Sequence, residues 1–143
     1  MEWRRADGYR VSDDAAELDR ARIWGWLSEQ AYWALGRSRE VVDRSIENSL
    51  NFGLFAPDGS QAGFCRFVTD RATFAWLCDV IVDPAHRRNG AGTWMVGVAV
   101  SHPDVAGVDR QVLATRDAHT LYERFGYRRF TEADRDRWMT WST

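Results

Sequence analysis

Three observations predict that residues 1–143 form a single domain of mixed α/β class, with a central, mostly antiparallel twisted sheet flanked by about four helices. First, a chain of 143 residues is long enough to bury one hydrophobic core, and no linker, repeat or low-complexity stretch divides it. Second, two stretches with helical apolar spacing separate the first predicted strand from the second. Third, two longer strands joined by a tight turn are followed by a helix and then by a strand, a helix and a strand.

Apolar spacing and helix-terminating residues define the elements of the first half. Ile23, Trp26 and Leu27 recur at helical spacing, and Gly36 interrupts that helix. Ser38 is a typical N-cap and opens the next helix. The first half is therefore expected to contain a strand over 9–11, helices over 19–33 and 38–50, and a strand over 51–56.

Turn residues divide the second half in the same way. Residues 57–60, Pro-Asp-Gly-Ser, form a turn, Pro103 ends one helix and Gly126 ends another. The expected elements are strands over 61–70 and 73–82, a helix over 90–102, a strand over 111–114, a helix over 117–125 and a strand over 127–130. No element is assigned to the charged tail over 131–143.

Composition excludes several classes of function. The chain has a net charge of −2, and its 19 basic residues, all arginine, are spread along the sequence. Nucleic acid is therefore not an expected partner. The absence of lysine excludes a Schiff-base mechanism and self-acetylation on a lysine side chain. No apolar run approaches the ~20 residues of a membrane span, no leader is evident, and a cytoplasmic location is the expectation. Cys65 and Cys78 lack metal-ligand spacing; two reduced, buried residues are expected, with a disulfide or a reactive thiol as the alternative.

The most informative stretch covers residues 82–92. It leaves an apolar strand, turns at Pro84, and enters a helix through Arg-x-x-Gly-x-Gly. Gly90 and Gly92 at a helix start let the backbone approach a bound group with free N–H donors. The positive end of the helix dipole favours an anion there, and Arg87 adds a fixed charge. The stretch therefore predicts a phosphate-binding site.

Two other phosphate loops are excluded by their residues. A P-loop needs a lysine, and the Gly-x-Gly-x-x-Gly fingerprint fails because the next glycine after Gly92 is Gly97. The stretch instead resembles the acyl-CoA signature of the GNAT superfamily of N-acyltransferases, Gln/Arg-x-x-Gly-x-Gly/Ala after a Val-x-Pro turn. The matching residues are Val82, Pro84, Arg87, Gly90 and Gly92. Arg88 is a departure, because many members carry glycine there; its side chain is tolerable if it points outward.

A second segment, residues 115–127, resembles the later motif of the same superfamily, Asn-x-x-Ala-x-x-x-Tyr-x-x-x-Gly-Phe/Tyr. It follows a short apolar strand, and Asp117 is a plausible N-cap of its helix. Ala118, Tyr122, Gly126 and Tyr127 are in register with the motif. Thr115 replaces the usual asparagine, and it can hydrogen-bond a pantetheine amide with fewer groups.

The resemblance covers roughly residues 62 to 130 and implies an N-acetyltransferase that uses acetyl-CoA as co-substrate and no metal. It implies that the fourth and fifth strands are splayed and that acyl-CoA enters between them. It also implies direct attack on the thioester by a primary amine of a small molecule or peptide, in a ternary complex. The residues expected to bind acetyl-CoA are Val80, Ile81, Val82, Arg87, Arg88, Asn89, Gly90, Ala91, Gly92, Thr93 and Thr115.

The same resemblance implies that Tyr122 is the general acid that protonates the departing thiolate; the alternative is a core tyrosine. Asp79 is the candidate general base, since a carboxylate within an apolar strand is expected to have a raised pKa. Its alternative is a structural carboxylate paired with an arginine or a backbone N–H. Trp33, Tyr32 and Ser49 are expected to shape the acceptor pocket.

Two other functions remain open. The chain could be a non-catalytic acyl-CoA-binding or sensor module, or a transferase that uses another acyl group or an alcohol acceptor. Structural or solvated positions are expected for His86, His102 and His119. The expected partner is the amine substrate, with neither nucleic acid nor membrane, and a homodimer is an assembly found among similar proteins.

Overall fold

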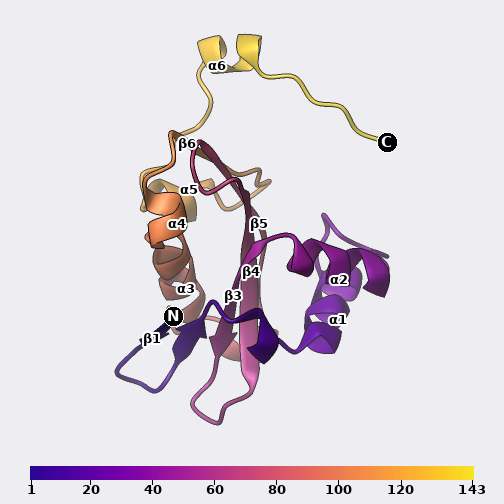
Figure 1. Ribbon diagram of the computed structural model, residues 1–143, viewed down its shortest axis with the longest axis vertical. Helices are drawn as coiled ribbons and strands as arrows, with labels where there is room; N and C mark the ends of the chain where they lie inside the picture. The colour runs from indigo at the N-terminus through magenta and orange to yellow at the C-terminus, as the bar shows by residue number, and fades with distance from the viewer.

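The computed structural model describes residues 1–143 and contains one six-stranded sheet with helices on both faces (Figure 1). The first four pairs of neighbouring strands are antiparallel, and only the last pair is parallel. The mixed α/β class predicted from the sequence is confirmed. In spatial order the strands are β1 (Glu2–Arg4), β2 (Arg10–Ser12), β3 (Leu50–Phe55), β4 (Gln61–Thr69), β5 (Phe74–Val82) and β6 (Arg110–Val112).

Two helical layers cover the sheet. In Figure 1, α1 and α2 lie on one side of the central strands, and α3 and α4 lie on the other. Phe64 and Ile81 belong to the core beneath α1 and α2, whereas Phe52, Phe67 and Met95 belong to the core beneath α3. The helices are α1 (Arg20–Gln30), α2 (Arg39–Glu47), α3 (Ala91–Val100), α4 (Pro103–Ala106), α5 (His119–Glu123) and α6 (Glu132–Arg137), with 3-10 turns at Ala15–Glu17 and Pro84–His86.

Side-chain caps determine where α1 and α2 begin. The Asp19 carboxylate accepts a hydrogen bond from the Arg22 N–H at 3.0 Å, and the Ser38 hydroxyl oxygen accepts one from the Val41 N–H at 3.3 Å. Both starts agree with the sequence prediction. The first helix ends at Gln30, so residues 31–38 form an irregular connection instead of a further helical turn.

The sheet opens between β5 and β6. Their parallel pairing is confined to three positions, from Phe74 opposite Arg110 to Trp76 opposite Val112. Since β5 continues to Val82, residues 77–82 present an unpaired edge on the side of β6. This divergence is the splay that the family resemblance implies. The predicted fourth and fifth strands correspond to β5 and β6, because β1 was not among the predicted strands.

A β-bulge interrupts the pairing of β4 and β5. Phe64 faces Ile81 and Arg66 faces Cys78, so two residues of β5 lie opposite Cys65 alone. Asp79 is one of the two, and its φ of +53° places it in the left-handed region. Aspartate tolerates this conformation better than most residues, because its short side chain can be held by local partners. The bulge directs the Asp79 side chain away from a regular strand position.

Three terminal features differ from the prediction. β1 was not predicted, because three residues at a sheet edge give no periodic signal. The strand predicted over 127–130 is wrong: Arg128 pairs with Asp134 instead, and the Tyr127 hydroxyl donates to the Gln111 side chain at 2.7 Å. The tail contains α6, which opens with a reciprocal capping box between Thr131 and Asp134.

The two cysteines form no disulfide. Cys65 is buried and Cys78 is half-buried, so Cys78 is more accessible than expected. Burial raises the pKa of both thiols, which keeps them protonated and unreactive at neutral pH.

None of the helices has both the length and the apolar character that crossing a membrane requires.

Candidate functional site

The loop that joins β5 to α3 is held in place by side chains from the other end of the sheet. The Tyr9 hydroxyl lies 2.8 Å from His86 Nδ1 and accepts a hydrogen bond from Asn89 Nδ2 at 2.9 Å. Arg5 Nη2 donates to the carbonyl oxygen of Asn89 at 3.2 Å. Tyr9 therefore links two positions of the loop, His86 and Asn89, to the outer strands of the sheet.

This loop and the first turn of α3 present a set of unpaired backbone N–H groups. Asn89 Oδ1 accepts the Ala91 N–H at 3.0 Å and so caps the helix. The N–H groups without an acceptor in the protein are those of Arg87, Arg88, Asn89, Gly90, Gly92 and Thr93. With the dipole of a ten-residue helix behind them, these donors suit a group with several negative oxygens.

Backbone conformation explains two of the motif positions in this loop. Gly90 has φ +76°, a value that strongly favours glycine. Arg88 has φ +70°, so the residue that departs from the family motif occupies a left-handed conformation that glycine would adopt without strain. Its exposed position keeps the long side chain out of the loop, as the sequence prediction required.

Gly92 has a packing role in addition to the predicted one. A Cβ at this position would lie 2.6 Å from Cγ2 of Val82, well inside van der Waals contact. Gly92 is therefore needed so that α3 can start close to the end of β5. Arg87 strengthens the same junction, because its Nε donates to the Val82 carbonyl oxygen at 3.0 Å while its remaining N–H groups stay free.

Tyr122 lies on α5 and is buried among residues of the larger core, with 8% of its surface exposed. Its hydroxyl makes no hydrogen bond, and the only buried polar side-chain atom without a partner is Asn51 Oδ1. The Tyr122 hydroxyl oxygen is thus in contact with solvent and free to donate. Burial raises its pKa to about 12, which keeps the phenol protonated at neutral pH.

The start of α5 differs from the prediction, because Ala118 is its N-cap residue and no side chain caps the helix. Asp117, the predicted N-cap, is exposed and makes no capping bond. Thr115 Oγ1 instead accepts a hydrogen bond from the Ala118 N–H at 3.1 Å and stabilises the turn that leads into the helix. Its hydroxyl hydrogen remains available to a ligand.

Asp79 is surrounded by donors. It accepts hydrogen bonds from Arg66 Nε at 2.7 Å, from Arg37 Nη1 at 3.0 and 3.1 Å, and from Trp33 Nε1 at 3.0 Å. Burial alone would raise the pKa of this carboxyl, but Arg66, Arg37 and Trp33 outweigh it and hold the pKa below its usual range. The expected raised pKa is therefore wrong, and the structure agrees with the alternative of a carboxylate paired with arginine.

The predicted acceptor-pocket residues lie on this side of the sheet. Tyr32 and Trp33, in the connection between α1 and α2, are 41% and 43% exposed, and their rings meet edge to face at 5.0 Å. The Tyr32 hydroxyl accepts the Arg116 N–H at 3.0 Å, which links this connection to the segment before α5. Ser49 Oγ accepts a hydrogen bond from Arg66 Nη1 at 3.0 Å.

A cavity of about 1040 Å³ lies along the other side of β6. Thr115 and Tyr122 line one part of it, and Tyr127 and Phe130 line another. Residues 127–130, over which the strand was wrongly predicted, line this cavity. Neither the start of α3 nor Asp79 lines it.

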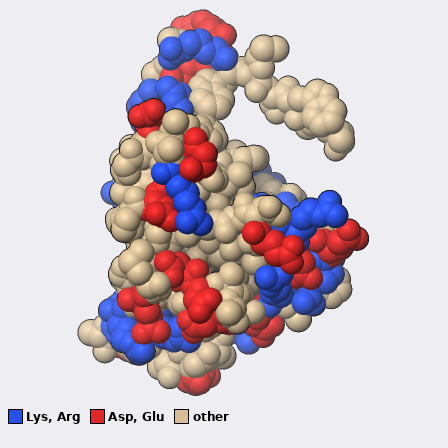
Figure 2. Space-filling view, in the orientation of Figure 1, with Lys and Arg blue, Asp and Glu red and all other residues tan.

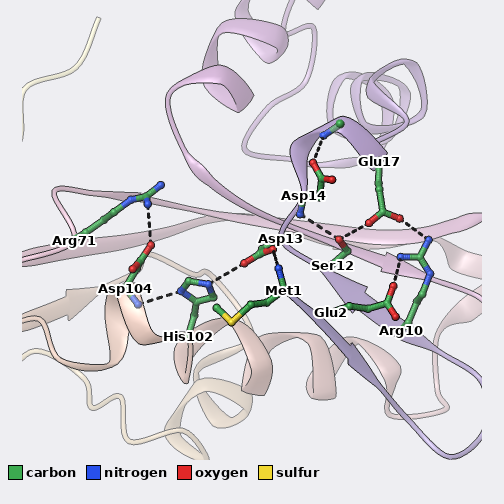
Figure 3. A network of polar contacts seen from close by, with 11 residues as sticks. Met1, Glu2, Arg10, Ser12, Asp13, Asp14, Glu17, Arg71, His102 and Asp104 are labelled. Atoms are coloured by element: carbon green, nitrogen blue, oxygen red, sulfur yellow. Dashed lines mark hydrogen bonds and ion pairs between the residues drawn. The ribbon is translucent and has the colours of Figure 1, made fainter.

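The histidines have structural contacts, as expected for them. His102 is buried; its Nε2 lies 3.0 Å from Asp13 Oδ2, and its Nδ1 accepts the Asp104 N–H at 3.1 Å (Figure 3). These bonds join the start of α4 to the N-terminal strands. His86 is held by Tyr9, and His119 lines the cavity beside β6.

Charged side chains of both signs are mixed on the visible face of the molecule (Figure 2). They gather over α2, over β1 and β2, and over α6, with no region of a single sign that would suit a nucleic-acid backbone. The described residues contain no group of three or more His, Cys, Asp or Glu side chains placed to hold a metal ion.

Known proteins are similar to this chain in sequence and in fold. A family model for the acetyltransferase (GNAT) domain matches residues 50–129. A candidate acetyltransferase of Gibberella zeae is 28% identical over 154 residues, which cover 92% of this chain and 85% of that protein. The crystal structure of a candidate GNAT acetyltransferase from Xanthomonas campestris pv. campestris is 38% identical, with a TM-score of 0.87, and the match covers 94% of this chain and 93% of that one.

A more distant similarity is one of fold alone. N-acetylglutamate synthase from Neisseria gonorrhoeae, complexed with coenzyme A and N-acetyl-glutamate, is 16% identical, with a TM-score of 0.69. The match covers 88% of this chain and 30% of that one.

We predict that Gly92→Ala weakens coenzyme A binding at least tenfold and lowers the free energy of unfolding by about 1–3 kcal/mol, as overpacking does. The added Cβ must push α3 away from Val82 or force that side chain to rotate. Calorimetric titration with coenzyme A measures the first effect and denaturant unfolding the second.

Two further variants show whether packing is the cause. Gly107→Ala is the matched control, because a Cβ at Gly107 meets nothing within 4 Å. The double variant Val82→Ala with Gly92→Ala removes the collision and should recover the stability. Unchanged affinity in Gly92→Ala would show that the start of α3 does not bind the coenzyme.

We predict that Asp79→Asn destabilises the protein at neutral pH by about 2–3 kcal/mol, because two partly buried guanidinium groups lose their counter-charge. A folded-state pKa below the unfolded value means that the Asp79 contribution is complete above about pH 4 and disappears as the pH falls through the folded pKa. The stability difference between wild type and variant should therefore be constant from pH 7 to 5 and shrink below pH 4. A difference that does not change down to pH 2.5 would contradict the ion pairing.

Proposed function

This chain belongs to the GNAT acetyltransferase family, and from that premise we propose that it transfers an acetyl group from acetyl-CoA to a primary amine of a small molecule or peptide. One observation carries the proposal. The unpaired N–H groups at the start of α3 lie beside the end of the open edge of β5, where a diphosphate and an extended amide chain can be bound in one line.

We assign coenzyme binding to two backbone features. The N–H groups of residues 87–93 would bind the diphosphate, and the free N–H groups of the Arg87 side chain would add charge-assisted bonds. The open edge at Val80–Val82 would pair with the pantetheine amides as a further strand does. Thr115 would offer its hydroxyl hydrogen to the same part of the ligand.

Tyr122 is the proposed general acid. Acetyl-CoA supplies an activated acyl group and a thiolate that must gain a proton when the amine takes its place. A phenol with an unpartnered hydroxyl and a pKa of about 12 stays protonated until that moment and can then donate. Its burial excludes most of the water that would compete for the proton.

Asp79 has a positioning role in this proposal and is not the base. Each carboxylate oxygen already accepts bonds from charged or indole donors, and its lowered pKa makes it a weak proton acceptor. What it does is hold Trp33, Arg37 and Arg66 together on the acceptor side. The proton of the ammonium group would leave to solvent on the side of the exposed Trp33.

The proposal is tested by incubating the protein with acetyl-CoA and a panel of primary amines, with thiol release and product mass as the readout. We expect thiol release that depends on the amine, together with a product that is roughly 42 mass units heavier than the amine, the mass that an acetyl group adds. Coenzyme binding with no release for any amine would support a non-catalytic acyl-CoA-binding module instead.

We predict that Tyr122→Phe lowers kcat by about 10²–10⁴-fold, the usual contribution of a general acid, and leaves coenzyme A affinity within a factor of about two. Tyr127→Phe is the matched control, because its hydroxyl is already bound to Gln111 and its ring lies 6.2 Å from that of Tyr122. The kcat of the wild-type protein should not fall through ionisation of Tyr122 at any pH up to about 10, because the pKa of this phenol is about 12. Unchanged turnover in Tyr122→Phe would remove the assigned role.

A further inference from the structure

The acceptor side of the site carries an excess of positive charge. Arg37 and Arg66 both pair with Asp79, and neither has another carboxylate partner. Two guanidinium groups therefore share one carboxylate, which leaves one positive charge uncompensated. The Arg37 and Arg66 side chains are 23% and 12% exposed, so this charge is only partly screened by water.

Arg116 adds a second uncompensated charge. It makes no ion pair, and its guanidinium carbon lies 3.8 Å from the centre of the Tyr32 ring. The aromatic face holds the side chain in place through a cation–π contact, which leaves its N–H groups unused. An exposed arginine that is positioned by a ring, without a carboxylate, is free to bind an anion from solution.

These residues form one continuous surface, which we call the acceptor wall: Tyr32, Trp33, Arg37, Arg66 and Arg116. Trp33 joins it to Asp79, and the Tyr32 ring joins Trp33 to Arg116. The Tyr32 hydroxyl also accepts the backbone N–H of Arg116 at 3.0 Å. The acceptor wall is thereby linked to the segment just before α5, the helix that carries the proposed general acid.

We propose that the acceptor is an amine that carries an anionic group, a carboxylate or a phosphate, in the same small molecule, and that Arg116 is the residue that selects it. This inference rests on the acetyltransferase function proposed above. A protonated amine without an anion is repelled by the acceptor wall, whereas a zwitterion brings a counter-charge. The guanidinium fork of Arg116 matches two oxygens of such a group, and the exposed rings of Tyr32 and Trp33 offer apolar contact to the rest of the molecule.

The test compares matched amines that differ only in the anionic group. Phenylalanine is paired with 2-phenylethylamine, tyrosine with tyramine, and glucosamine 6-phosphate with glucosamine. For wild type we expect kcat/KM at least tenfold higher for the anionic member of one or more pairs, with the difference mainly in KM. The first two pairs report on a carboxylate and the third on a phosphate.

Two variants assign the selectivity to Arg116. Arg116→Gln should raise KM for the anionic acceptor at least tenfold, leave KM for the partner amine without the anion and the affinity for coenzyme A unchanged, and so abolish the discrimination. Arg124→Gln is the matched control, because Arg124 is an exposed arginine on the next helix with no ion pair, and it should change nothing.

The outcomes separate the two proposals. If the amines that lack the anionic group were acetylated as well as their anionic partners, or if Arg116→Gln lowered activity equally for both, this inference would be overturned and the acetyltransferase function left intact. Thiol release with none of the amines, while coenzyme A still binds, would overturn the proposed function and this inference with it.

Discussion

The parting of β5 from β6 after Trp76 is the constraint on which the other features of the molecule depend. A strand inside a sheet normally has both edges paired, and an unpaired buried edge is costly because its N–H and C=O groups lose water. Here the open edge runs to the loop that leads into the start of α3. The same residues that leave the sheet incomplete therefore provide a row of polar groups for a ligand.

The bulge at Asp79 is the second departure from a regular sheet, and it assembles the ion cluster around this carboxylate. A regular β5 would place residue 79 in the alternation of the strand, whereas the bulge and the positive φ turn its carboxylate toward Trp33, Arg37 and Arg66. One strained residue in this way gathers groups from α1–α2, β4 and β5 at a single point. Strain of this kind persists only when its surroundings fix it, and three donors on one carboxylate do so.

Features that depend on neighbouring residues could be predicted from the sequence, whereas contacts between residues far apart in the chain could not. Ser38, Asp19 and the glycines of the α3 loop act through neighbours within a few residues, so the starts of α1 and α2 and the turn into α3 were predicted correctly in place. Arg37 and Arg116 act on partners 42 and 84 residues away, and only the folded chain brings them together. Arg66, a lone charge in an apolar strand next to the strand of Asp79, was the one signal that could have revealed the ion cluster. The strand over 127–130 was wrong because the pattern of apolar residues gives no information on which segment β6 has room to pair with.

The Tyr9 hydroxyl, which contacts both His86 and Asn89, has a consequence for the thermodynamics of ligand capture. A flexible loop must lose conformational freedom when it closes around a diphosphate, and this loss weakens affinity. Here the ordering occurs when the polypeptide folds, so the calorimetric entropy of capture should be less unfavourable than that of a mobile loop. Tyr9, which lies between β1 and β2, would in this way affect affinity for an anion at the α3 loop from the edge of the sheet opposite β6.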